Sequence, residues 1–224
     1  MKKERVRRVA NRVNFNLNKV EALNDRQAAM LGSDKHLIAH GFAGTGKTFL
    51  AVYMALQAIL VTNEYQRLTI IRSAVPTRKE GFLPGNDKEK SEVYQRPYKD
   101  IMSDLFDRGD AYDQLKAKMI VDFQTTSFIR GNNIKDSVII VDECQNMTMH
   151  ELDSIITRIN ENCRIIFCGD MLQSGDLGYH EESGLGPFYD ILKKMDEFDF
   201  IEFGLEDIVR SGLVKSYLMA KYSK

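Results

Sequence analysis

Short apolar runs alternate with longer stretches of mixed polarity along most of the chain. Each run spans three to five residues between polar neighbours, which is typical of buried strands rather than of helices. The predicted strands cover residues 37–39, 68–71, 119–123, 137–141, 164–168 and 200–203. Residues 137–141 are almost purely β-branched, which favours a central parallel strand that is apolar on both faces.

Helical segments are predicted between these strands. Asn24 or Asp25 can cap a short helix that ends at Gly32, and residues 49–61 are apolar almost throughout, which predicts a buried helix. A capping-box spacing opens an amphipathic helix over residues 148–159. Further helices are predicted over residues 98–106, 183–195 and 207–222, and a charged turn over residues 87–90. This alternation predicts an α/β fold, a parallel sheet with helices on both faces.

A glycine-rich stretch separates the first strand from the buried helix. Residues 41–48 match the phosphate-binding P-loop spacing G-x-x-x-x-G-K-[ST]. Its glycines let the backbone take positive φ, so that amide groups and the amino terminus of the next helix face anionic oxygens. A chance glycine turn is the alternative, and the strand-turn-helix context argues against it. The sequence therefore predicts a P-loop NTPase (RecA-like) site.

The side chains of this motif have distinct predicted roles, with ATP and Mg²⁺ as the expected cofactors. Lys47 would reach the β- and γ-phosphates and assist catalysis, and Thr48 would hold Mg²⁺ through its hydroxyl. Gln27, just ahead of the first strand, could pair with an adenine edge, although a surface glutamine needs no function. The residues predicted to contact the nucleotide are Gln27, Gly41, Ala43, Gly44, Thr45, Gly46, Lys47, Thr48 and Gln145.

Two carboxylates follow the β-branched strand. Asp142 stands at its end, where a carboxylate can hold the Mg²⁺ that Thr48 also binds. Glu143 comes next and is the natural general base for the attacking water, which favours hydrolysis over phosphoryl transfer to a second substrate. An ordinary acidic strand end is the alternative, and the P-loop upstream outweighs it.

Other polar side chains could complete this catalytic site. Gln145 and Gln173 follow successive strands and could register the presence of the γ-phosphate. Arg72, Arg158 and Arg210 are candidates for stabilising the transition-state charge, and each could equally form a surface ion pair. Arg210 is favoured because it opens the last predicted helix. The sequence leaves open whether it acts on its own site or on a neighbour's.

Two basic segments could contact nucleic acid. Residues 72–85 form a long polar segment after a predicted strand, which could be a lid or could follow a nucleic-acid backbone and offer Phe82 for stacking. Residues 2–12 carry six basic side chains and one acidic one, which suits a solvated arm as well as a phosphate contact.

Taken together, the motifs resemble those of the PhoH-like ATPases, whose core is similar to the first motor domain of superfamily-one helicases. The matching segments are residues 41–48, 81–85, 129–131, 141–148, 157–158, 169–173 and 207–210. The resemblance implies ATP binding and hydrolysis, with residues 169–173 matching the motif that couples γ-phosphate to nucleic acid. Positions that depart from the family's usual residues are Ser73, Asn132, Asn133, Cys144 and Ser211.

The resemblance also implies an assembly. A two-domain helicase holds ATP between two motor lobes, whereas a chain of 224 residues has the length of one such lobe. We therefore expect a homo-oligomer, a hexameric ring by resemblance, in which Arg210 or Arg158 is offered across the interface.

Composition narrows the setting. The chain has 31 Lys and Arg against 32 Asp and Glu, so any nucleic-acid surface must be local. Its three cysteines argue against a disulfide framework, and no apolar run approaches the roughly 18 residues of a membrane span. The basic opening lacks an apolar h-region. We expect a cytoplasmic protein with a basic arm over residues 1–20 and one ATPase domain over residues 21–224.

The leading hypothesis is a Mg²⁺-dependent ATPase that acts as a helicase-like motor on single-stranded nucleic acid, with RNA favoured over DNA. The alternative is a nucleotide-dependent switch or scaffold, in which ATP orders residues 72–85 for a protein partner. A small-molecule kinase is a weaker third interpretation, because Glu143 is suited to activate water.

Overall fold

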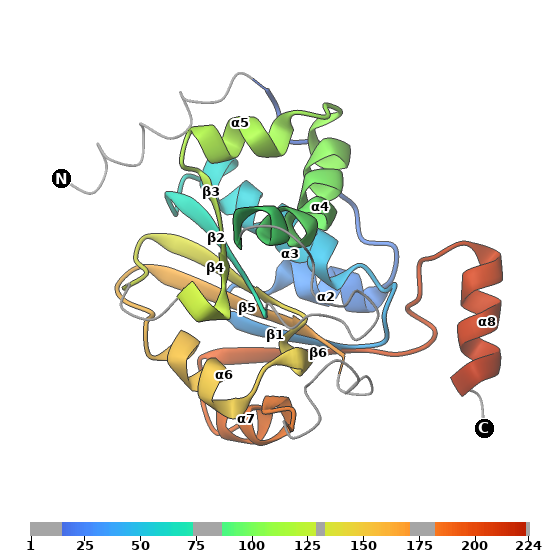
Figure 1. Ribbon diagram of the computed structural model, residues 1–224. Coiled ribbons are helices and arrows are strands. Elements are labelled where there is room, and N and C mark those ends of the chain that lie inside the picture. Colours follow the sequence, from blue (N-terminus) through green and yellow to red (C-terminus); the bar gives the residue numbers. More distant parts are fainter. Residues whose placement is uncertain (1–14, 74–86, 129–132, 171–181, 223–224) are drawn as a thin grey trace.

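The central element of the fold is a six-stranded parallel sheet (Figure 1). The computed structural model describes residues 15–73, 87–128, 133–170 and 182–222, and for residues 87–91 the backbone alone. The strands are β1 (His36–Gly41), β2 (Arg67–Arg72), β3 (Val121–Thr125), β4 (Ser137–Asp142), β5 (Cys163–Gly169) and β6 (Phe198–Phe203). Their order in the sheet is β3-β2-β4-β5-β1-β6, which confirms the predicted α/β class.

Helices cover both faces of this sheet, as predicted (Figure 1). On one face lie α2 (Asp25–Gly32), α3 (Lys47–Leu56), α4 (Asp87–Phe106) and α5 (Ala111–Ala117), and on the other lie α6 (Met149–Ile156) and α7 (Leu185–Leu192). The short helical turns are η1 (Gln57–Val61), which continues α3, η2 (Thr126–Phe128) and η3 (Cys144–Asn146). The buried apolar residues accordingly form two clusters, one on each side of the sheet.

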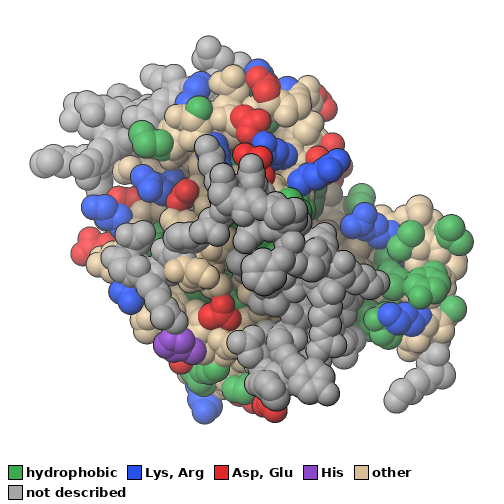
Figure 2. Space-filling view, viewed as in Figure 1, with side chains coloured by type: hydrophobic (Ala, Val, Ile, Leu, Met, Phe, Trp, Pro, Cys, Tyr) green, Lys and Arg blue, Asp and Glu red, His purple; other side chains and the backbone are tan. Residues whose placement is uncertain are grey.

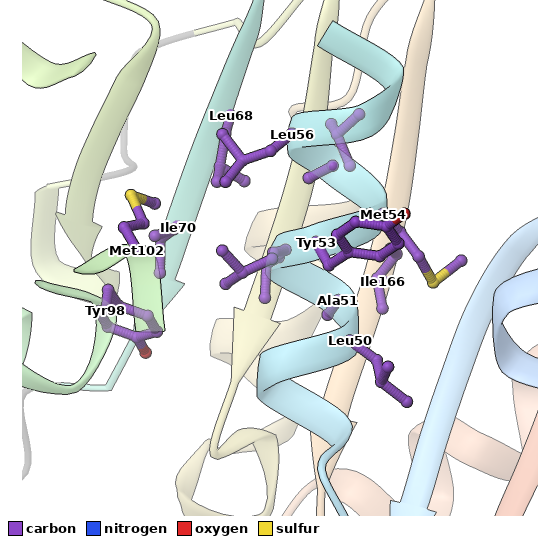
Figure 3. Packing of buried hydrophobic residues seen from close by; sticks show 14 of the residues in the cluster. Leu50, Ala51, Tyr53, Met54, Leu56, Leu68, Ile70, Tyr98, Met102 and Ile166 are labelled. Atoms are coloured by element: carbon purple, nitrogen blue, oxygen red, sulfur yellow. The ribbon is translucent and has the colours of Figure 1, made fainter. Parts of the chain in front are cut away.

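The larger cluster surrounds α3. Leu50 and Leu56 of this helix are buried in one cluster with Leu68 of β2, Tyr98 of α4 and Ile166 of β5 (Figure 3). Fully burying a side chain of this size contributes about 1.5–3 kcal/mol. This packing fixes the start of α3, and with it the end of the P-loop, against the centre of the sheet.

Helix α4 is longer than the sequence predicts. The charged turn expected over residues 87–90 is the first turn of α4, which runs on through Pro97. The charges suggested a turn because they lack apolar periodicity, whereas Tyr98, Met102 and Leu105 follow helical spacing and are buried. The sequence also misses α5.

The strand predicted over residues 119–123 begins at Val121. Met119 takes a φ of +58° in the turn that closes α5, and its amide donates to the carbonyl of Lys116. A residue in that conformation cannot continue into a strand.

The last helix, α8 (Gly212–Tyr222), begins later than the predicted residue 207. The residues before it bond elsewhere: the amide of Gly204 donates to Asp207 Oδ2 at 2.8 Å, and the amide of Val209 donates to the carbonyl of Gly44 at 3.0 Å. Arg210 therefore precedes the helix that it was expected to open.

Helix α8 stands apart from the sheet and its covering helices (Figure 1). None of its residues is buried, and Leu213 and Tyr217 are 83 % and 64 % exposed. Apolar side chains gather on this projecting helix (Figure 2).

Residues 15–20, the end of the predicted basic arm, lie against α4. The Phe15 ring meets that of Phe106 edge-on with centroids 4.8 Å apart, and the amide of Asn18 donates to the carbonyl of Leu105 at 2.9 Å. Cys144, Cys163 and Cys168 are free thiols. In the ranges that the structure describes, no helix is long and apolar enough to cross a membrane.

Candidate functional site

The P-loop connects β1 to α3 at the carboxyl edge of the sheet. Gly41, Gly44 and Gly46 have φ angles of +119°, +81° and +90°. At Gly41 a side chain would collide with the backbone of Phe203 in the neighbouring strand β6. Both the φ angles and this close approach require glycine, so the loop is shaped by the main chain and held by β6.

Lys47 lies folded against this loop. Its ammonium donates to the carbonyl oxygens of Gly41 and Phe42 at 2.8 and 2.7 Å, and the residue is only 9 % exposed. Burial lowers the pKa of Lys47. The Thr45 hydroxyl also donates to the Phe42 carbonyl, whereas Ala43 is exposed at the tip of the loop. Lys47 can exchange these neutral carbonyls for phosphate oxygens, which are stronger acceptors.

Thr48 and Asp142 meet at the centre of the site. The hydroxyl of Thr48 donates to Asp142 Oδ1 at 2.8 Å, and the hydroxyl of Tyr98 in α4 donates to Asp142 Oδ2 at 2.7 Å. Burial and the Asp142 charge raise the pKa of Tyr98 well above its usual range, so the phenol stays a donor. The sequence does not single out Tyr98, because its helical spacing with other apolar residues suggests an ordinary core position.

The donor set at this point suits Mg²⁺. Among the described residues, no group of three or more His, Cys, Asp and Glu side chains could hold a metal ion. Mg²⁺ requires less, because it is usually held by one or two protein oxygens together with substrate phosphates. The hydroxyl of Thr48 and the carboxylate of Asp142 are hard oxygen donors beside the glycine loop, so they fit a phosphate-bound Mg²⁺.

Glu143 and Gln145 follow Asp142 at the carboxyl end of β4. Glu143 has a left-handed backbone, with φ +52° and ψ +39°. Gln145 Nε2 donates to Glu143 Oε2 at 2.6 Å, and Gln145 Oε1 accepts from the amide of Asp170 at 3.0 Å. Burial and the neighbouring Asp142 raise the pKa of Glu143. The side-chain carboxamide of Gln145 therefore links the end of β4 to the residue after β5, and it orients the half-buried side chain of Glu143.

Gln27 is bonded within the protein. Its Nε2 donates to the carbonyl of Thr45 at 3.0 Å, and its Oε1 accepts from the amide of Leu23 at 2.8 Å. The residue is 3 % exposed. Asn24 caps α2 by accepting from the Gln27 amide, as the sequence predicts. The side chain of Gln27 thus supports the P-loop, and an adenine contact would use its second donor and second lone pair.

Arg72 and Arg210 lie at the same edge of the sheet as the P-loop. Arg210 is exposed, and its Cγ would lie 2.7 Å from a Cβ built on Gly44. Arg72 ends β2 in register with Asp142. Its guanidinium lies 5.7 Å from the centre of the Tyr94 ring, and its charge acts on the nearby Tyr98 and Asp142.

Arg158 lies at the opposite edge. Its carbonyl accepts from the amide of Ile134, which precedes the start of β4, while Asp142 stands at the far end of that strand. A strand of this length rises roughly 17 Å at about 3.3 Å per residue. Arg158 therefore cannot reach the P-loop of its own chain.

Several predicted features lie outside the described residues. They are Gln173, Phe82 with residues 81–85, residues 129–131 and the basic residues 2–12.

Comparisons with known proteins find similar sequences along most of the chain. The model of a family described as "PhoH-like protein" matches residues 19–222. The chain is 34% identical over 205 residues to the "PhoH-like protein" of Bacillus subtilis (strain 168), covering 90% of this chain and 63% of that protein. It is 30% identical over 190 residues to "Protein PhoH" of Escherichia coli (strain K12), covering 84% and 53%. The chain thus spans between about half and two thirds of the length of these relatives.

A solved structure shares the fold. The large terminase from a thermophilic bacteriophage superimposes with a TM-score of 0.52 at 11% sequence identity, covering 91% of this chain and 51% of that one. At this identity the likeness is one of fold alone.

Proposed function

Because the chain belongs to the PhoH-like protein family, we propose that it binds ATP with Mg²⁺ at the P-loop and hydrolyses it. The observation that carries this proposal is the hydrogen bond of 2.8 Å between Thr48 and Asp142, beside a loop that only glycine can form. It joins residues 94 positions apart in the sequence. In a P-loop ATPase these two side chains hold the metal on the β- and γ-phosphates.

The side chains of this site would divide the chemistry among them. Lys47 and the loop amides would bind the phosphate oxygens, and Mg²⁺ when bound would neutralise charge on the terminal phosphates. Glu143 would accept the proton of the attacking water. Its raised pKa brings it nearer to neutral pH, where a general base is most effective. Gln145 holds one Glu143 oxygen at 2.6 Å, which leaves the other for water.

In the proposed motor function, the protein forms a homo-oligomeric ring and acts on single-stranded nucleic acid, with RNA favoured over DNA. In such a ring Arg158 would have to act on the nucleotide of a neighbouring copy, because it lies at the amino edge of the sheet. Arg210, beside Gly44, would serve the site of its own chain. In this proposal residues 21–224 work as one ATPase unit.

The test is the ATPase rate with and without single-stranded RNA and single-stranded DNA, over a range of salt concentrations. We expect turnover that rises with one of the two nucleic acids and a stimulation that weakens steeply with salt. A Glu143→Gln sample purified in parallel controls for contaminating ATPases. Turnover that neither nucleic acid alters would eliminate the motor and leave the hydrolysis intact.

The second candidate function is a nucleotide-dependent switch that orders a segment for a protein partner. The net charge of −1 favours it, because a nearly neutral chain gains little general attraction to nucleic acid. It requires nucleotide binding without appreciable turnover. Wild-type protein that binds ATP yet hydrolyses it no faster than Glu143→Gln would favour the switch over the ATPase.

A further inference from the structure

The carboxylate of Asp142 is held by two hydroxyl groups from different helices. Thr48 at the start of α3 donates to Oδ1, and Tyr98 in the middle of α4 donates to Oδ2. Asp142 is 4 % exposed and Tyr98 is fully buried. With each oxygen bound, the rotation of the carboxylate about its Cβ–Cγ bond is fixed.

Tyr98 has a second charged neighbour besides Asp142. Arg72 stands at the end of β2 in register with Asp142. Its positive charge acts on the Tyr98 hydroxyl and opposes the rise in the pKa of Tyr98 that burial and Asp142 cause. The guanidinium is in turn packed over the ring of Tyr94, one helical turn before Tyr98 in α4.

A phenylalanine would fill the same volume in the core at Tyr98, so packing alone does not call for a hydroxyl. A buried acceptor that loses its donor is destabilising, and the affected acceptor here is an oxygen of the proposed Mg²⁺-binding carboxylate. Partners of metal-binding side chains typically change metal affinity or activity by about 10–100-fold when they are removed.

We propose that Tyr98 is a positioning residue for the Mg²⁺ site, and that Arg72 holds Tyr98 in place. The hydroxyl of Tyr98 keeps Asp142 in the orientation in which Oδ1 accepts from Thr48, so that the lone pairs of the Thr48 oxygen would be left for Mg²⁺. This inference rests on the proposed function and adds to it two residues that lie outside the P-loop and the Asp142–Glu143 pair.

The test compares Tyr98→Phe with Tyr112→Phe. Tyr112 is a matched control, because it is a buried tyrosine whose hydroxyl donates to Gln95 at 2.8 Å, and it lies in α5, outside the site. Binding of a fluorescent ATP analogue is measured at equilibrium, first in EDTA and then against increasing Mg²⁺. Thermal melting of each variant reports on folding.

In Tyr98→Phe, we expect the Mg²⁺ concentration that gives half of the gain in affinity for the ATP analogue to rise by about 10-fold or more. The affinity for the analogue in EDTA should be unchanged. Tyr112→Phe should keep the wild-type Mg²⁺ dependence. If Tyr98→Phe does not fold, Arg72→Lys tests the same chain of contacts and should raise the Mg²⁺ requirement less.

Two outcomes would overturn the inference, and they are distinguishable. A folded Tyr98→Phe, or failing that Arg72→Lys, with wild-type Mg²⁺ dependence would end the positioning role while leaving the ATPase proposal in place. If the nucleotide affinity of the wild-type protein does not depend on Mg²⁺, the proposed function is wrong, and so is this inference.

Discussion

The two sides of the site are built from different material. The P-loop side, residues 41–48, is made of main chain with three positive φ angles and is clamped against β6. The carboxylate side, Asp142 to Gln145, presents side chains that hydrogen bonds orient. Substitutions in the P-loop are expected to alter the shape of its backbone, so few should be tolerated. Substitutions among the carboxylate-side residues can remove a catalytic group and leave the backbone unchanged.

The largest effect is expected from Glu143→Gln, which tests the carboxylate side. The amide is isosteric and cannot accept the proton of water, so turnover should fall about 10²–10⁴-fold. ATP binding and the melting temperature should stay near those of wild type. Single-turnover hydrolysis with binding measured in parallel checks this. A matching loss of binding would mean that Glu143 shapes the pocket instead of activating water.

The next effect is expected on the other side, from Gly41→Ala. An added Cβ meets the backbone of Phe203, which cannot move aside as a side chain can, at a φ of +119°. We expect the free energy of unfolding to fall by about 1–3 kcal/mol, together with weakened nucleotide binding. Urea denaturation measures the first.

Gly32→Ala is the matched control for that substitution. A Cβ at Gly32, the last residue of α2, would have no other atom within 4 Å. This variant should be as stable as wild type or more so, by about 0.5–1 kcal/mol. Equal losses of unfolding free energy in the two variants would show that the close approach of Gly41 to the Phe203 backbone does not shape the loop.

A smaller effect is expected for pH. Burial and Asp142 raise the pKa of Glu143, and the hydrogen bond from Gln145 opposes that shift. The active base is the ionised form, so activity should fall as the pH drops through this raised pKa. Gln145→Leu removes the opposing bond and should move the acid limb of the pH–rate profile to higher pH. An unmoved limb would assign it to another group.

The sequence predicts the elements whose signals are local. The P-loop between β1 and α3 and the β-branched run of β4 can be recognised from neighbouring residues alone. Because the carboxyl ends of parallel strands share one edge, Thr48 and Asp142 could be expected to lie near each other. The contact at 2.8 Å is in keeping with that reasoning.

What the sequence misses depends on contacts between distant segments. Tyr98 looks like any core residue of α4 until its hydroxyl is seen beside Asp142. Arg210 was expected to open a helix because nothing in its neighbourhood reveals that Val209 bonds to Gly44. The position of Arg158, by contrast, follows from the order of the elements, because the connection between α6 and β5 lies at the amino edge of a parallel sheet, away from the P-loop.

The hydrogen bond between Val209 and Gly44 has a consequence for the stage of translation at which the P-loop can adopt its shape. The neighbour of strand β1 in the sheet, β6, and the segment that bonds to the glycine loop are translated more than 150 residues after β1 itself. A nascent chain that ends after β5 would carry every motif of the P-loop without the partners that fix its shape. Competence for nucleotide should therefore appear only after β6 and the segment up to Val209 have left the ribosome.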